Sequence, residues 1–281
     1  MSSFFPSQVI AASWLHEHLQ DQDVVILDAT IPKVVGDVTG IPFPEIQIPK
    51  TRFFDLKKKF SDSNSHLPNM LPSAEHFAMA AQELGIHKES KIIVYDRLGI
   101  YSSPRVWWMF KTMGHRNVAV LDGGLPAWLE AGLPTEEATE QTYGRGNFHA
   151  DLQPERVRDM EEVKQNLIEE TEVVVDARSS GRFHATAPEP RSDLKGGHIP
   201  KSYSLPYTEL LADGKLRSKD ELYTLFKALD LPKKKIVYSC GSGITACVLL
   251  LAAEQAGIQQ GAIYDGSWTE WGQADGVPIE K

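Results

Sequence analysis

A chain of 281 residues, 42 % of them hydrophobic, is long and apolar enough to bury the core of one large domain or of two smaller ones. The net charge of −9 argues against nonspecific binding to nucleic acid or to an anionic membrane, so an anionic substrate would need a locally positive pocket. The only cysteines, Cys240 and Cys247, exclude a disulfide framework. Because we find neither a signal-peptide pattern nor an apolar run of about 18 residues, we expect a reducing cytoplasm as the location.

Strands and helices alternate along the first half of the chain. Short β-branched runs predict strands, and apolar residues at helical spacing, such as Phe77, Ala80 and Ala81 after the capping Ser73, predict helices. The predicted strands are residues 24–27, 48–55, 91–95 and 118–121, and residues 30–50 are expected to be largely a loop. The predicted helices are residues 13–20, 73–84, 102–113 and 125–131.

The second half of the chain repeats this pattern. The predicted strands are residues 173–175, 236–239 and 262–264, and the predicted helices are residues 159–168, 218–229, 244–256 and one that begins at residue 268. Matched points keep an almost constant offset of 143 to 148 residues, as between Asp28 and Asp176 or between Asp122 and Asp265. This spacing predicts an internal duplication of a whole domain.

Each copy should therefore be an α/β domain with a mostly parallel sheet flanked by helices. We predict a first domain over residues 1–140, a polar linker over residues 141–158 and a second domain over residues 159–281.

The second copy carries the strongest chemical signal. Its buried strand ends at Cys240, and Gly241, Ser242 and Gly243 form a turn that opens an apolar helix. Inward-facing amides and the helix N-terminus favour an anion at such a turn, so the thiol should lose its proton more readily than a free thiol. Cys240 is therefore the candidate nucleophile, with its sulfur expected at the mouth of the second domain. The alternative is a buried cysteine that only fills space.

The two copies differ at this loop. The 143-residue offset places Arg97 opposite Cys240, so the first copy lacks a nucleophile. One copy would then carry the chemistry, while the other supplies scaffold and one wall of a cleft.

A tandem α/β repeat with a cysteine loop only in the second copy resembles the rhodanese superfamily. The loop from Cys240 to Thr245 is similar to that of the 3-mercaptopyruvate sulfurtransferases, because it lacks the Arg or Lys that thiosulfate-preferring members usually place there. Further matches are Asp176-Ala177-Arg178, Gly181-Arg182-Phe183, Glu189-Pro190-Arg191, Gly197-His198-Ile199-Pro200, Trp107-Trp108 and Tyr264-Asp265-Gly266-Ser267-Trp268.

The resemblance implies a sulfurtransferase that works through a Cys240 persulfide. The sulfur would come from 3-mercaptopyruvate with release of pyruvate, and a thiol, thioredoxin or cyanide would accept it, with no cofactor and no metal. Ser242 and Asp55 would assist catalysis, although Ser242 could be only a turn former or helix cap and Asp55 only structural. The remaining loop residues would bind the substrate through their amides: Gly241, Gly243, Ile244 and Thr245.

Arg182 and Arg191 are the residues that the resemblance assigns to the substrate carboxylate and ketone. A planar guanidinium fits a carboxylate bidentately, and an acidic protein needs local positive charge to hold an anion. The alternative is that both are solvated surface residues. Arg178 is expected to pair with Asp176 or with loop carbonyls.

One position departs from the family pattern, because Asn69 stands before Met-Leu-Pro where a histidine is usual, with His66 nearby. Three other functions are alternatives for a cysteine loop of this kind. A cysteine phosphatase would need an arginine at the position that Ala246 occupies. A thiosulfate sulfurtransferase usually has a charged residue in this loop. The third alternative is a persulfide carrier without catalytic activity, and the absence of pyruvate release would distinguish it from a sulfurtransferase.

Overall fold

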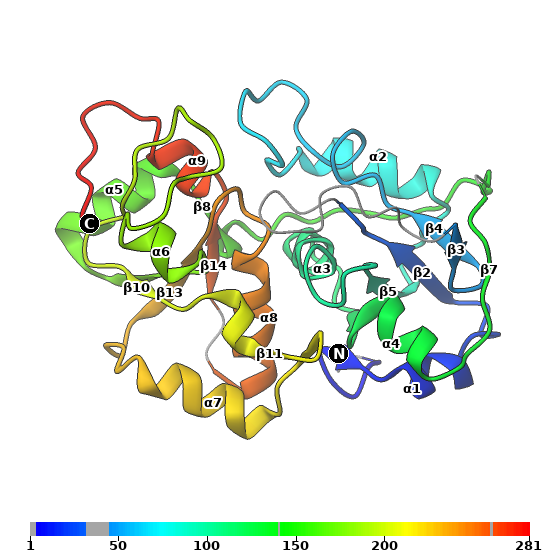
Figure 1. The fold of residues 1–281 in the computed structure, drawn as a ribbon. Coiled ribbons are helices and arrows are strands. Elements are labelled where there is room, and N and C mark those ends of the chain that lie inside the picture. Colours follow the sequence, from blue (N-terminus) through cyan, green and yellow to red (C-terminus); the bar gives the residue numbers. More distant parts are fainter. Residues whose placement is uncertain (1–3, 32–44, 140, 259–260) are drawn as a thin grey trace. The chain divides into compact units, whose positions relative to one another are not determined.

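The computed structural model describes residues 4–31, 45–139, 141–258 and 261–281, so most of the expected loop at 30–50 lies outside the described residues. The chain forms two compact units (Figure 1). The first comprises residues 1–63, 71–153 and 213–216, and the second comprises residues 64–70, 154–212 and 217–281. Each half of the chain therefore contributes a short segment to the unit built by the other half.

The first unit contains a five-stranded sheet in the order β1-β6-β5-β2-β4, with every neighbouring pair parallel. Its strands are β1 (Val9–Ile10), β2 (Val24–Asp28), β4 (Thr51–Phe53), β5 (Lys91–Tyr95) and β6 (Val118–Leu121). Its helices are α1 (Ala12–Glu17), α2 (Ala74–Glu83), α3 (Ser103–Thr112) and α4 (Gly124–Glu130). β3 (Ile46–Gln47) pairs antiparallel with β7 (Glu136–Glu137), and β12 (Lys215–Leu216) also belongs to this unit.

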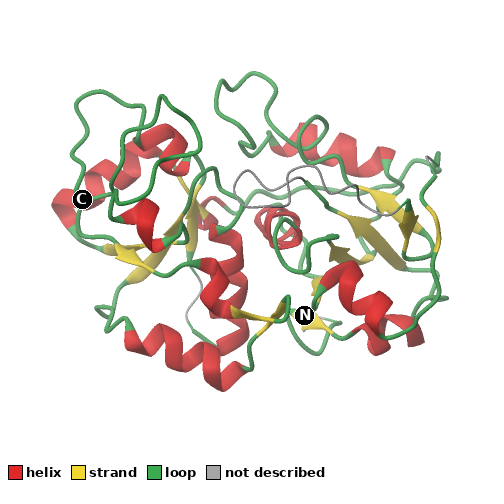
Figure 2. Cartoon of the chain, in the orientation of Figure 1, coloured by secondary structure: helices red, strands yellow, loops and turns green. Residues whose placement is uncertain are grey.

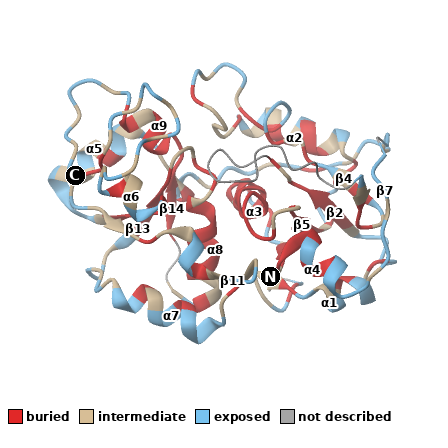
Figure 3. Ribbon diagram, viewed as in Figure 1, coloured by how far each residue is buried: buried red, intermediate tan, exposed pale blue. Residues whose placement is uncertain are grey.

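Alternate residues of these strands supply two apolar faces. Residues such as Ile26, Ile93 and Leu121 pack with Leu15 of α1 and Trp128 of α4. On α2 and α3, Phe77 and Phe110 lie within an aromatic cluster that also contains Phe54, Phe60 and Phe148. The strands and helices of this unit are buried along these faces (Figure 3).

The second unit again combines strands with helices (Figure 2). Its sheet has the order β10-β9-β13-β14-β8 and is parallel throughout. Its strands are β8 (Val157–Arg158), β9 (Glu172–Asp176), β10 (Tyr203–Ser204), β11 (Leu211–Ala212), β13 (Lys235–Ser239) and β14 (Ala262–Tyr264). Its helices are α5 (Met160–Glu169), α6 (Ser180–Phe183), α7 (Lys219–Ala228), α8 (Ala246–Ala256) and α9 (Ser267–Trp271), with 3-10 turns at Pro154–Arg156 and Tyr207–Leu210. Two domains of one α/β class confirm the predicted duplication and fold class.

Helix α8 explains how the second unit fixes its central loop. Nine of its eleven residues are buried, and a helix that is apolar all round can only lie within a core. It packs against β13, β14 and α7. On the other face of the sheet, α5 and α9 contribute Val163, Trp268 and Trp271 to a cluster with Val174 and Val237.

The region expected as a linker contains ordered structure. Val157 and Arg158 form the outer strand β8, which pairs with β14, and Arg158 is ion-paired with Glu172 at 2.7 Å. An edge strand with one neighbour tolerates polar residues, so its composition resembled that of a linker. Before it, Gly146 and Phe148 donate backbone hydrogen bonds to Gln82 and Ile86 of the first unit. None of the helices in the described ranges is both long and apolar enough to cross a membrane.

Candidate active site

Cys240 directly follows the buried strand β13 and is itself 1 % exposed. Gly241 and Ser242 beside it are half-buried. We expected the sulfur at the mouth of the domain, and the structure buries the residue almost completely. A reagent can reach this sulfur only when neighbouring groups move. Burial alone would also fit a structural cysteine, so the polar surroundings of the residue must decide its role.

The loop backbone leaves a set of amides unpaired. Within the described parts of the chain, the amides of Gly241, Ser242, Ile244, Thr245 and Ala246 donate no hydrogen bond, whereas the Cys240 amide donates to Ser267 Oγ (3.2 Å). Gly243 has a φ of 76°, which a side chain would disfavour. Successive unpaired amides at a turn form an anion-binding concavity.

Helix α9 fixes the direction of these amides. Trp268 donates to the Cys240 carbonyl (2.9 Å), and both the amide and the hydroxyl of Thr269 donate to the Gly241 carbonyl (2.8 and 2.7 Å). In a trans peptide the N–H points opposite to the preceding carbonyl, so the amides of Gly241 and Ser242 face away from α9. Buried Ser267, at a φ of 51°, completes this anchor by donating to Tyr264 O (2.8 Å).

Arg182, on the short helix α6, lies against the loop. A Cβ atom placed on Gly241 would be 3.2 Å from Arg182 Nη2, so the guanidinium occupies the space beside this glycine. Glu189 accepts from Arg182 Nη2 at 2.6 Å and from Arg178 Nη1 at 2.8 Å. The side chain of Arg178 has no exposed surface, pairs with Asp176 at 2.7 Å and stacks on Trp268. As predicted, Arg178 pairs with Asp176. Burial lowers the pKa of Arg178, but the carboxylates of Asp176 and Glu189 raise it by more, so the net shift is upward.

Arg191 reaches the same loop by a different route. Its Nη1 donates to Thr269 Oγ1 (2.9 Å), and this hydroxyl in turn donates to Gly241 O. Arg191 and Glu189 also line a cavity of about 350 Å³ in the second unit, together with residues between Ala185 and Gly196. Two arginines thus connect to one glycine through independent contacts, and neither is a freely solvated surface residue.

The other predicted site residues are distributed as follows. Ile244 is buried, and half-buried Thr245 precedes α8 without a side-chain cap. Ser242 accepts from Asn69 Nδ2 (3.2 Å), within the segment of residues 64–70 that belongs to the second unit. Asp55 lies half-buried in the first unit, where its carboxylate accepts from the Lys58 amide (3.1 Å).

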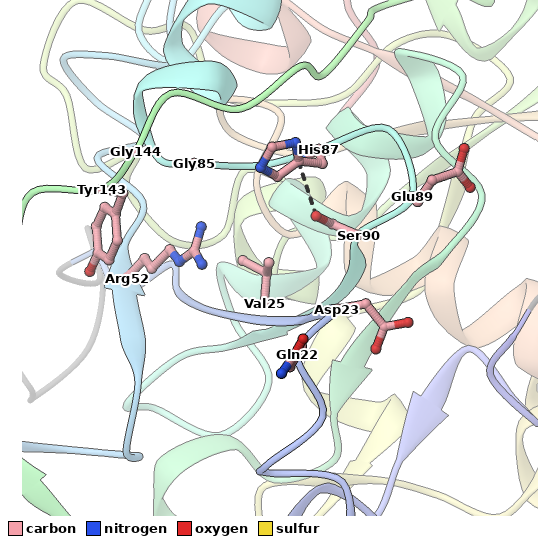
Figure 4. A pocket seen from close by; sticks show the side chains of 10 residues that line it. All are labelled: Gln22, Asp23, Val25, Arg52, Gly85, His87, Glu89, Ser90, Tyr143 and Gly144. Atoms are coloured by element: carbon pink, nitrogen blue, oxygen red, sulfur yellow. Dashed lines mark hydrogen bonds between the residues drawn. The ribbon is translucent and has the colours of Figure 1, made fainter.

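A separate cavity of about 490 Å³ lies in the first unit (Figure 4), and its lining does not include Asp55. Arg52 points into it and lies 4.6 Å from the ring centroid of Tyr143, and burial lowers the Arg52 pKa. The lining also includes the polar side chains of Gln22, Asp23, His87 and Glu89. In the described residues no group of three or more His, Cys, Asp or Glu side chains is placed to hold a metal ion.

The chain is similar to known proteins over most of its length. The model of the rhodanese-like domain matches twice, at residues 11–131 and 159–274. The chain belongs to the rhodanese family.

Relatives of known name cover nearly the whole chain. Human 3-mercaptopyruvate sulfurtransferase is 41 % identical over 94 % of this chain and 91 % of the relative's length. The Escherichia coli K12 3-mercaptopyruvate sulfurtransferase is 38 % identical over 96 % of this chain and 97 % of its own length. The crystal structure of an E. coli 3-mercaptopyruvate sulfotransferase aligns with a TM-score of 0.83 and 37 % identity, covering 93 % of this chain and 99 % of that structure.

The sequence did not predict three contacts at this rhodanese loop, namely those of Glu189, of Thr269 and of Asn69. Glu189 lies within a motif quoted for its arginine, and Thr269 directly follows the Tyr264–Trp268 motif, so inspection of motif neighbours could have found both. The Asn69 contact joins residues 173 positions apart, and no local pattern announces it.

Proposed function

We propose that this rhodanese-family protein transfers sulfur from 3-mercaptopyruvate to a thiol, thioredoxin or cyanide, with Cys240 as the persulfide carrier. The observation that carries the proposal is one cysteine at a loop of unpaired amides, with Arg182 and Arg191 both connected to Gly241. The uncharged loop and the names of the relatives support mercaptopyruvate as the donor.

In the first half-reaction the Cys240 thiolate attacks the sulfur of the substrate. A sulfur–sulfur bond forms, the carbon–sulfur bond breaks, and its electron pair remains on carbon as the pyruvate enolate. The proton lost by the substrate thiol balances the proton that this carbon takes up, so the products are pyruvate and an anionic persulfide. The amides of Gly241, Gly243, Ile244 and Thr245 stabilise that anion, and Ser242 hydrogen-bonds to the substrate or relays its proton.

The arginines bind the rest of the substrate. Arg182 and Arg191 hold the carboxylate and the ketone, because a guanidinium offers paired donors in one plane. Glu189 and Thr269 keep the two arginines in place. Asp55 acts with Ser242 in this proposal, as the family pattern suggests.

In the second half-reaction an acceptor thiolate attacks the outer sulfur, takes it as a new persulfide and releases the Cys240 thiolate. Two chemical steps through one covalent intermediate predict ping-pong kinetics. We assign the catalytic function to residues 159–281, a supporting function to residues 1–140 and the connection to residues 141–158. Two free cysteines fit a reducing compartment such as the cytoplasm.

Steady-state kinetics with both sulfur donors test the proposal. We expect turnover with 3-mercaptopyruvate to exceed turnover with thiosulfate by orders of magnitude. Without acceptor, each active site should release one pyruvate and gain the mass of one sulfur atom on Cys240. Cys240→Ser should abolish both signals, and Cys247→Ala is the matched control that retains them. Comparable rates with the two donors would favour a thiosulfate sulfurtransferase, and a persulfide formed without pyruvate would favour a carrier.

A further inference from the structure

A hydrogen bond from Asn69 determines what Ser242 can do. Asn69 Nδ2 lies 3.2 Å from Ser242 Oγ and 3.4 Å from the Ser242 backbone oxygen. A carbonyl oxygen can only accept, so the amide must present its NH2 group to both atoms. The hydroxyl oxygen of Ser242 is therefore the acceptor, and its proton must point elsewhere.

The proton of this hydroxyl remains available to a ligand. No described residue accepts a hydrogen bond from Ser242 Oγ, and the residue is half-buried two positions after the nucleophile. The side-chain amide of Asn69 does not ionise in the physiological pH range, so titration of Asn69 does not alter this arrangement.

The backbone also fits this role. Asn69 has a φ of 61°, in the left-handed region that asparagine and aspartate enter more readily than most residues. Leu67, two residues earlier, is 7 % exposed, and the segment of residues 64–70 belongs to the second unit. The side-chain amide is thereby fixed above the loop that carries Cys240.

We propose that Asn69 is a positioning residue, which holds Ser242 as a hydrogen-bond donor to the bound sulfur donor. This inference rests on the proposed sulfur transfer. It adds a direction to the hydrogen bond: Asn69 donates to Ser242, and Ser242 donates to the substrate.

Two variants with the same backbone preference test the direction. Asn69→Gly removes the donor without backbone strain, and we expect kcat for 3-mercaptopyruvate to fall about 5- to 10-fold, as for one lost hydrogen bond, with little change in KM. Asn69→Asp keeps the shape but can only accept when ionised, so it takes the Ser242 proton from the substrate. We expect a larger fall in kcat, on the order of 10- to 100-fold, that diminishes as acid protonates the new carboxyl.

A double-mutant cycle separates positioning from a general structural role. If Asn69 acts through Ser242, Ser242→Ala lowers kcat by itself, and adding Asn69→Asp changes it by less than about twofold. Equal kcat in wild type, Asn69→Gly and Asn69→Asp would overturn the positioning role while wild-type pyruvate release still upheld the proposed function. Additive losses in the cycle would also overturn it. A wild type that releases no pyruvate would reject the sulfur transfer and this inference with it.

Discussion

The two copies of the strand–loop–helix unit have opposite solutions to the same backbone geometry. In the first unit, β5 leads into a loop whose amides converge on the buried carboxylate of Asp96. One oxygen accepts from the amides of three residues and from one hydroxyl, and the other accepts from a fourth amide: Tyr101, Ser102, Ser103 with its Oγ, and Leu98. In the second unit, no described group accepts a hydrogen bond from the corresponding amides.

The 143-residue offset matches each amide donor of the first loop with one amide of the second loop. The four donors to Asp96 correspond to Gly241, Ile244, Thr245 and Ala246, and all four of these amides lack a partner among the described residues. Ser239 stands where the first copy has Asp96. In the first unit four amides converge on Asp96, and we expect the matching amides of the second unit to leave room for an anion because Ser239 carries no carboxylate.

The residue opposite Cys240 takes part in an ion pair. Arg97 stands in place of Cys240 and donates from Nε to Asp28 at 2.8 Å, with both side chains largely buried. The first loop thus contains an ion pair and an internal acceptor where the second has a cysteine and amides without a partner among the described residues.

Transferring the carboxylate should abolish activity without unfolding the second unit. Ser239→Asp places an acceptor where Asp96 lies in the first copy, and charge-assisted hydrogen bonds to the loop amides would compete with the persulfide. We expect kcat/KM for 3-mercaptopyruvate to fall by more than about 100-fold, because hydrogen bonds to a charged group contribute about 1.5–3 kcal/mol each. Far-UV circular dichroism and persulfide yield are the measurements.

Ser239→Ala is the control for that substitution. The Ser239 hydroxyl is buried without a partner in the described structure, so its removal should leave activity close to that of wild type. If Ser239→Asp folded and turned over normally, the four amides would not be the anion site.

The arginines distinguish substrate binding from activation of the thiol. Arg182→Ala and Arg191→Ala should each raise KM for 3-mercaptopyruvate about 10- to 100-fold, since each loses a charged hydrogen bond to the substrate. Glu189 keeps its bond to Arg178, and Thr269 keeps its bond to Gly241, so the loop should retain its geometry. Alkylation of Cys240 by iodoacetamide should then proceed at nearly the wild-type rate. A collapse of alkylation in these variants would assign the arginines to the thiol instead.

Sequence patterns predicted the fold and the candidate loop more completely than the contacts around that loop. The parallel strands, the duplication and the cysteine loop depend on local periodicity and on one repeated offset, which a linear reading detects. Glu189, Thr269 and Asn69 act through contacts that only the folded chain creates, such as the bond between Arg191 and Thr269 across 78 positions. The burial of Cys240 and the internal acceptor Asp96 also depend on how a loop closes in three dimensions, although both residues lie beside predicted strands.

The smallest expected effect concerns the stability of the first unit. Asp96→Ala leaves several buried donors unpaired, so we expect a loss of about 3 kcal/mol or more in the free energy of unfolding, measured by urea denaturation. Asp96→Asn should cost less, because its oxygen can still accept from the three amides that converge on one point, while its NH2 group faces the Leu98 amide. Neither change touches the loop that carries Cys240. If Asp96→Ala left stability unchanged, the converging amides would not need an internal acceptor.

The direction of the Asp96 pKa shift predicts how the stability difference between wild type and Asp96→Asn depends on pH. Burial raises the Asp96 pKa, although the amide and hydroxyl donors oppose this effect. A raised pKa in the folded state means that the folded chain holds this proton more tightly than the unfolded chain. The resulting stability is fully present below the unfolded pKa of about 3.9 and is lost as the pH rises through the folded pKa. Wild type should therefore gain stability relative to Asp96→Asn on acidification, and a difference between the two that stayed constant from neutral pH to about pH 4 would contradict the shift.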